Sequence, residues 1–240
     1  MKILFIYPPE TIFGPGVAAV TPPLGLAYLA AYIEKLDYQV KILDCLAEGK
    51  GQDKFIGKYH RFGLSEKGIK KWIADYKPDV VGISVMFTAF AKDALDVAKL
   101  AKEVSKKIVV VLGGAHVSIA PKATVKEKNV DVIVYGEGEV TFANLLDALR
   151  NKTDLADITG IAYKKGRKAF LNGPTAIIPD LDSLPLPARH LLPMEKYQSK
   201  HDPYNMRQPL TSIVTSRGCP AKCVYCSIHS IWGFGWRGRS

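Results

Sequence analysis

The sequence is poor in cysteine and has no long apolar run. Four cysteines in 240 residues are too few for the disulfide framework of a secreted scaffold, so a reducing compartment fits better. The N-terminal apolar run Lys2–Tyr7 stops at Pro8, which makes it too short for a signal-peptide core or a membrane span. We therefore expect a cytoplasmic protein without a membrane span.

A dense basic run with interleaved aromatic residues, which is typical of nucleic-acid binding, is also missing. The formal net charge is +10, and the basic excess is concentrated in residues 151–240. The basic run at 164–168 falls at an expected hairpin tip, where solvated charge is the usual explanation. A positive field can favour an acidic protein partner, an anionic substrate or nucleic acid, and nucleic acid is the least favoured of these partners.

Short β-branched runs alternate with longer helical patterns, which predicts βαβ units around a parallel sheet. We expect five strands, at Lys2–Tyr7, Gln39–Leu43, Val80–Ser84, Ile108–Leu112 and Val132–Tyr135. We expect helices at Pro22–Leu36, Ser65–Tyr76, Ala89–Lys106, Pro121–Lys128 and Val140–Arg150. The predicted fold class is a doubly wound α/β domain over residues 1–150, flavodoxin-like or Rossmann-like, whose ligand binds beyond the carboxyl ends of the strands.

The composition changes after this domain. The runs Ile158–Lys164 and Lys168–Leu171 predict a small hairpin, and a proline-rich stretch after it indicates an extended connector. Together they form a predicted linker over residues 151–205. The alternating run Leu210–Ser216 predicts a strand at the start of a third part, residues 206–240.

Small or polar residues follow the expected strands, at Asp44, Gly49, Ser84, Gly113, Gly114, Gly136 and Glu137. Any one of these glycines could serve only a tight turn, but their coincidence across several loops favours a ligand that approaches the backbone closely. Gly136 and Gly138 also match part of a dinucleotide fingerprint. The third glycine of that fingerprint is missing, because Phe142 and Ala143 occupy its region, so NAD is poorly supported.

Three of the four cysteines, Cys219, Cys223 and Cys226, share one loop with the spacing Cys-x3-Cys-x2-Cys. Such thiolates can turn onto one face, which suits a cluster of soft metal ions and leaves one coordination position without a protein ligand. A structural zinc site would need a fourth ligand, for which His229 is the nearby candidate. A disulfide would leave one thiol unpaired. Cys45, far from the loop, is expected to be a small buried hydrophobe.

The array, with Pro220 after its first cysteine and Tyr225 before its last, resembles the signature of radical S-adenosylmethionine (radical SAM) enzymes. In that family three cysteines hold a [4Fe-4S] cluster, and S-adenosylmethionine chelates the fourth iron. The resemblance implies that Cys219, Cys223 and Cys226 are cluster ligands and that Tyr225 lies beside the adenine. It also implies a reducing partner such as flavodoxin or ferredoxin. The family's barrel needs further βα units after this loop, so we expect a truncated chain.

The first 150 residues resemble the cobalamin-binding domain at the N-terminus of one large radical SAM class. The pattern Asp-x-His-x-x-Gly, Ser-x-Leu, Gly-Gly is matched at Asp44, Gly49, Ser84, Gly113 and Gly114, with Met86 in the Leu position. Leu46 stands where the wider cobalamin family has the histidine that binds cobalt, and it has no donor atom. His116 is an alternative ligand, although a hydrogen-bonding loop role fits it better. The run Val130–Glu139 resembles the domain's last strand and helix start, which adds Gly136 and Glu137 to the expected cofactor site.

The two resemblances imply a cobalamin-dependent radical SAM enzyme that acts on a small-molecule substrate. The most direct expectation is methyl transfer to an unactivated carbon, through a 5′-deoxyadenosyl radical and methylcobalamin. One alternative is a radical SAM methylthiotransferase of RNA or protein, which usually carries three further cysteines where this chain has only Cys45. Another is a non-catalytic corrinoid carrier or sensor with a vestigial cysteine loop. The residues do not decide between methylation, cyclisation and other radical outcomes.

Overall fold

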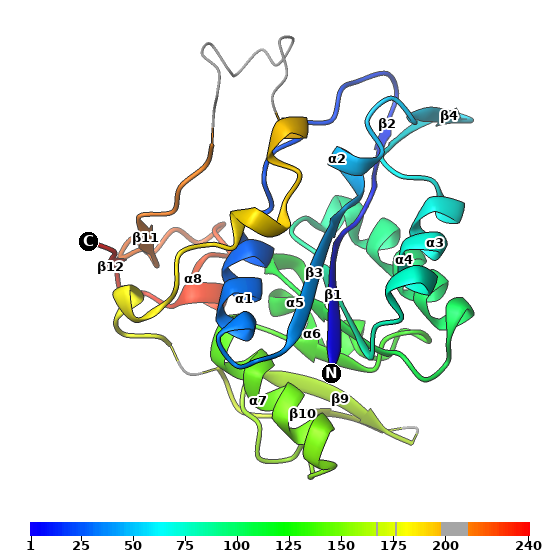
Figure 1. The fold of residues 1–240 in the computed structure, drawn as a ribbon. Coiled ribbons are helices and arrows are strands. Elements are labelled where there is room, and N and C mark those ends of the chain that lie inside the picture. Colours follow the sequence, from blue (N-terminus) through cyan, green and yellow to red (C-terminus); the bar gives the residue numbers. More distant parts are fainter. Residues whose placement is uncertain (167, 176, 198–210) are drawn as a thin grey trace.

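A mostly parallel β-sheet forms the centre of the fold, in a computed structural model that describes residues 1–166, 168–175, 177–197 and 211–240 (Figure 1). Its parallel strands are β1 (Lys2–Tyr7), β3 (Gln39–Asp44), β6 (Val80–Ser84), β7 (Val109–Gly113) and β8 (Val132–Val134). Their order in space, β3-β1-β6-β7-β8, is that of flavodoxin-like sheets. The predicted α/β fold class is confirmed, and each strand end lies within one residue of its predicted position.

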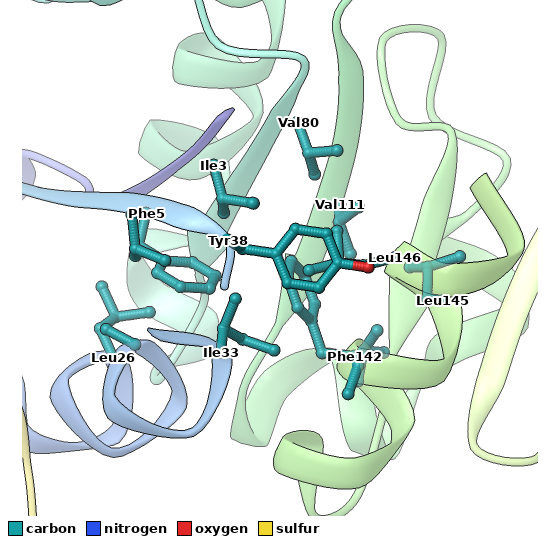
Figure 2. Close-up of a cluster of buried hydrophobic side chains, with 14 of the residues drawn as sticks. Ile3, Phe5, Leu26, Ile33, Tyr38, Val80, Val111, Phe142, Leu145 and Leu146 are labelled. Atoms are coloured by element: carbon teal, nitrogen blue, oxygen red, sulfur yellow. The ribbon is translucent and has the colours of Figure 1, made fainter. Parts of the chain in front are cut away.

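Helices cover both faces of the sheet. They are α1 (Leu24–Glu34), α3 (Glu66–Tyr76), α4 (Ala91–Val104) and α7 (Gly138–Asn151), with the short α2 (Cys45–Glu48) after β3 and η1 (Thr88–Phe90) before α4. Side chains alternate along β1, so Ile3 and Phe5 belong to the core under α1 and α7, whereas Leu4 and Ile6 belong to the core under α3 and α4. Figure 2 shows the first core, in which the ring centroids of Phe5 and Phe142 are 5.2 Å apart.

Two antiparallel strands extend the sheet beyond β8. The predicted hairpin is present as β9 (Ile161–Lys165) and β10 (Lys168–Leu171), but it is not a separate unit. Strand β9 pairs with β8, with Val132 opposite Tyr163, so the described part of the chain forms a sheet of seven strands and not the predicted five. The stacked rings of Tyr163 and Phe170 join the two added strands.

A second, three-stranded sheet was missed by the sequence analysis. It consists of β2 (Glu10–Phe13), β4 (Lys54–Ile56) and β5 (Tyr59–Phe62), in the order β2-β5-β4. The predicted helix at Pro121–Lys128 is also shorter, because α6 covers only Pro121–Thr124 and follows α5 (Ala115–Ile119). Pro121 has no amide proton to continue α5, so the chain breaks there and restarts.

The C-terminal part departs most from the prediction. The expected strand over Leu210–Ser216 is wrong for residues 211–215, and residue 210 lies outside the described residues. A strand begins only at Ser216, as β11 (Ser216–Arg217), within the described residues 211–217, and it pairs with β12 (Arg237–Gly238). The helix α8 (His229–Trp232) lies between them. The linker contains the short helical turns η2 (Leu181–Ser183), η3 (Arg189–Leu191) and η4 (Met194–Tyr197).

The linker lies on the α/β domain instead of standing away from it. Ala188 N donates to Ala27 O of α1 at 2.9 Å, and Ile178, Leu181 and Leu184 form a small buried cluster against Tyr32. The division into 1–150, 151–205 and 206–240 stays a prediction. No helix among the described residues is long and apolar enough to cross a bilayer.

Candidate functional site

The loops after the five parallel strands meet at the carboxyl edge of the sheet. In the parallel ladders Tyr7 lies opposite Asp44, Ser84 lies opposite Gly113, and Gly113 lies opposite Val134. The loops that follow these residues therefore open side by side along one edge. Glycine and short polar side chains from distant parts of the sequence come together there, as the sequence predicted.

Asp44 organises the first of these loops. Its Oδ1 accepts hydrogen bonds from Leu46 N at 2.9 Å and Ala47 N at 3.2 Å, which caps α2, and its Oδ2 accepts from Tyr197 Oη at 2.9 Å. The residue is only 1% exposed, and burial raises the pKa of its carboxyl to about 6. Protein groups occupy both oxygens, so Asp44 fixes Leu46 and the linker in place. The sequence contained no signal for Tyr197.

Leu46 and Gly49 are held by the chain that leaves β5. Leu46 is buried, and a Cβ placed on Gly63 would lie 3.4 Å from its Cδ2. A Cβ on Gly49 would lie 1.9 Å from Leu64 N, which no real structure tolerates. Gly49 is therefore required by packing within the protein, and the requirement needs no ligand.

Gly113 and Gly114 differ in whether the surrounding structure requires a glycine. Gly114 has a φ of +123°, and a Cβ there would lie 2.7 Å from Val85 O, so the backbone itself demands glycine. A Cβ on Gly113 would meet only Val134 O, at an ordinary 3.5 Å. A side chain at Gly113 would therefore meet no steric conflict, so packing within the protein does not require glycine there. Met86, from the loop after β6, is 47% exposed, so its side chain is accessible to a ligand.

A further polar cluster lies at the end of β1. Tyr7 Oη donates to Glu10 Oε1 at 3.0 Å, and Asp93 accepts from the hydroxyl and the amide of Thr11 at 2.6 and 3.1 Å. Burial raises the pKa of both Glu10 and Asp93, and the nearby Asp44 raises that of Glu10 further. The cluster attaches β2 to α4.

His116, the alternative cobalt ligand, places its Nδ1 3.0 Å from Thr88 Oγ1, as expected for a hydrogen-bonding residue.

Glu137 does not face the open edge. Its side chain is fully buried, its Oε2 accepts from Ile178 N at 2.9 Å, and its Oε1 forms an ion pair with Arg237. Glu139, in the first turn of α7, accepts two hydrogen bonds from Arg217, the shorter at 2.5 Å. A Cβ on Gly136, which has a φ of +73°, would lie 2.6 Å from Thr175 Cγ2. The carboxylates of Glu137 and Glu139 bind protein groups, so we assign Glu137 a structural role in place of direct contact with a cofactor.

The cysteine loop offers three free thiols. Cys219 is half-buried and Cys223 and Cys226 are exposed, and Cys226 N donates to Cys223 O at 3.2 Å in a tight turn. Tyr225 is 90% exposed. In the described ranges no three His, Cys, Asp or Glu side chains are gathered closely enough to hold a metal ion, so the thiols share a loop but are not preassembled. Three accessible soft donors on one loop fit an iron–sulfur cluster.

The loop is anchored where it starts. Gly218 has a φ of +82°, and a Cβ there would lie 1.8 Å from Gly235 O. The backbone before Cys219 therefore passes directly against the backbone after α8, which brings the two ends of the loop together. This close approach holds the cysteines in a closed loop of fixed ends.

Comparison with known proteins gives the site its family. The model of the B12 binding domain matches residues 14–146. The chain is 39% identical over 242 residues to an uncharacterized methyltransferase of Pyrococcus horikoshii, covering 100% of this chain and 48% of the relative. It is 34% identical over 270 residues to the cytidylyl-2-hydroxyethylphosphonate methyltransferase of Streptomyces wedmorensis, covering 100% of this chain and 50% of the relative. The chain thus spans about half the length of these relatives.

A solved structure shares the fold. The radical S-adenosylmethionine methyltransferase TsrM from Kitasatospora setae, with cobalamin and a [4Fe-4S] cluster bound, superposes with a TM-score of 0.69 at 19% identity, covering 100% of this chain and 43% of TsrM. At that identity the likeness shows the fold alone. The family match over residues 14–146 covers more than half of the sequence. The chain belongs to the B12-binding domain family.

Proposed function

We propose that this chain is the cobalamin-binding and cluster-bearing part of a radical SAM methyltransferase that methylates an unactivated carbon of a small molecule. The observation that carries the proposal is the attachment of a loop with three free thiols, at Cys219, Cys223 and Cys226, to a domain of the B12-binding family. The names of both relatives, and of TsrM, include methyltransferase activity. The more specific claim, that the methyl acceptor is an unactivated carbon, rests on the family resemblance.

The residues divide between two cofactor sites. The open edge beside Gly113, with Ser84 and Met86 next to it, would hold cobalamin. The three thiols would hold a [4Fe-4S] cluster, and S-adenosylmethionine would occupy the remaining iron position, beside Tyr225. When bound, these groups supply a 5′-deoxyadenosyl radical and a transferable methyl group. Leu46 has only a hydrocarbon side chain, so it would offer cobalt no donor atom and would not serve as its protein ligand.

The alternatives receive less support. A methylthiotransferase would need further cysteines for a second cluster, and Cys45 is fully buried with a thiol pKa raised by burial. A corrinoid carrier would not need three free thiols on one accessible loop. The reducing partner, a flavodoxin or ferredoxin, and the cytoplasmic location stay predictions.

The proposal is tested by cofactor loading under anaerobic conditions. We expect about four iron and four sulfide per chain after reconstitution, together with hydroxocobalamin that co-elutes and changes its visible spectrum. Cys223→Ser should abolish the iron content and leave the corrinoid in place. Cys45→Ala is the matched control and should retain both. Unchanged iron in Cys223→Ser would favour the carrier, and no corrinoid retention at micromolar protein would refute the cobalamin site.

A further inference from the structure

We propose that a buried network of two glutamates and two arginines, Glu137, Glu139, Arg217 and Arg237, positions the cysteine loop relative to the open edge of the B12-binding domain. This inference rests on the proposed function, because it concerns the geometry between the two cofactor sites. The four side chains are positioning residues. They touch neither set of proposed ligands directly but hold the elements that carry them.

The two arginines stand at the two ends of the cysteine loop. Arg217 in β11 precedes Cys219 by two residues, and Arg237 in β12 lies directly opposite Arg217 in the two-residue ladder. All three cysteines are contained between these strands. Fixing the two guanidinium groups therefore fixes both ends of the loop at once.

The two glutamates stand at the start of α7, just after the fifth parallel strand. Glu137 is the N-cap residue of α7 and Glu139 lies in its first turn, where the helix dipole favours a carboxylate. They belong to the segment that follows Gly136, one loop along the edge from Gly113. The glutamates are thus attached to the carboxyl edge of the sheet, and the arginines are attached to the two ends of the cysteine loop.

The pairing is close and shielded from water. Arg217 donates to both oxygens of Glu139, at 2.5 and 3.3 Å, and lies 3.7 Å from Glu137. Arg237 pairs with Glu137 and also donates to Ile178 O and to Trp232 O. The side chains of Glu137, Glu139, Arg217 and Arg237 are 0, 7, 9 and 12% exposed. Two carboxylates balance two guanidinium groups, so removing one member leaves a buried charge without its partner.

Neighbouring contacts make the same connection. Helix α8, from inside the loop, packs on α5, the helix that begins right after Gly114. A Cβ on Gly136 would lie 3.6 Å from Ile231 O of α8. Helix α8, which follows the three cysteines, therefore lies against the segments after β7 and β8. Reactions between two centres depend steeply on their distance and orientation, which is what such a rigid connection controls.

The first test needs no cofactor. Hydrogen–deuterium exchange is measured on peptides covering residues 218–236 and on peptides from β1 and β6. We expect Glu139→Gln to speed exchange in the loop at least about tenfold and to leave the central strands unchanged. Glu103→Gln is the matched control, because it makes the same change in an exposed ion pair with Lys70; its loop exchange should equal that of the wild type. Unchanged loop exchange in Glu139→Gln would overturn the proposal.

The second test reads the geometry between the sites. The reduced cluster and cob(II)alamin are both paramagnetic, so their magnetic coupling reports distance and orientation. We expect Glu139→Gln to load both cofactors within twofold of the wild type but to change the coupling in the electron paramagnetic resonance spectrum. The coupling in Arg217→Lys, which keeps the positive charge, should lie between that of the wild type and that of Glu139→Gln. Identical coupling in wild type and variant refutes the positioning role. A variant whose only defect is that it no longer binds iron also refutes it. A wild type that loads neither cofactor would instead refute the proposed function.

Discussion

The carboxylate of Asp44 accepts a hydrogen bond from the hydroxyl of Tyr197 at 2.9 Å, across 153 residues of sequence. Both residues are almost completely buried. Beside them Lys196 Nζ lies 2.6 Å from Glu48 Oε2, at the other end of α2. Lys196 and Tyr197 of the linker are thus fastened to α2 and its N-cap residue, which couples the linker to the candidate cobalamin site.

Removal of this hydroxyl should be measurable as a loss of stability. Tyr197→Phe leaves the Asp44 oxygen buried without that donor, so we expect the free energy of unfolding to fall by about 1–3 kcal/mol. Urea denaturation followed by circular dichroism measures the difference. Tyr59→Phe is the control, since Tyr59 is 52% exposed, and it should change stability by less than about 0.5 kcal/mol. Equal effects of the two variants would contradict the role of the buried hydroxyl.

The raised pKa of Asp44 predicts a pH dependence with a defined sign. Burial moves the pKa from 3.8 to about 6 in the folded chain. Between these values the unfolded chain loses its proton while the folded chain keeps it, so the stability contributed by Asp44 is present at low pH and declines as pH rises. Relative to Asp44→Asn, the wild type should lose up to about 3 kcal/mol between pH 4 and pH 6 and then level off. Urea titrations of both proteins from pH 4 to pH 8 measure this. A difference that grows in favour of the wild type as pH rises would show that the sign is wrong.

The sequence predicted the parallel sheet well because β1 and β6 are short, buried, β-branched runs between clear breaks. The addition of β9 to β8 could not be predicted, because an antiparallel strand at a sheet edge is selected by tertiary pairing and not by its own pattern. The second sheet was missed for a similar reason. Its strands are three or four residues long, and their only buried residues, Glu10 and His60, are polar, so they carry little hydrophobic periodicity.

The site shows the same limit at the level of single residues. Small residues at strand ends identified the carboxyl edge of the sheet as the candidate site. The pattern could not separate Gly49, which is required by the backbone of Leu64, from Gly113, where a Cβ would make only an ordinary contact. Nor could the pattern show that Glu137 forms an ion pair with Arg237, because that partner comes 100 residues later in the sequence. Long-range ion pairs have no local sequence signature.

The contrast between the two neighbouring glycines gives a third prediction. Gly114→Ala would force a side chain into a left-handed backbone and against Val85 O, so it should lower the free energy of unfolding by at least about 1–3 kcal/mol. Gly113→Ala adds only an ordinary contact and should leave stability unchanged within about 0.5 kcal/mol. If the space beside Gly113 receives cobalamin, Gly113→Ala should nevertheless weaken retention of hydroxocobalamin. Denaturant titrations and co-elution measure the two effects, and a Gly113→Ala chain that binds like the wild type would remove Gly113 from the site.

The four cysteines should divide into two classes of reactivity. Cys45 is fully buried, and burial raises the pKa of its thiol well above the ordinary value, so little thiolate is available to react. Cys223 and Cys226 are exposed and Cys219 is half-buried. With a chromogenic disulfide reagent at pH 8, the folded, iron-free chain should therefore release three equivalents of chromophore and the urea-unfolded chain four. Cys45→Ala should lower the unfolded count to three and leave the folded count at three. A folded count of four would mean that the core around α2 opens readily, and Asp44 would then be a poor anchor for the linker. A folded count below three would mean that the thiols of the loop are not all free to bind iron.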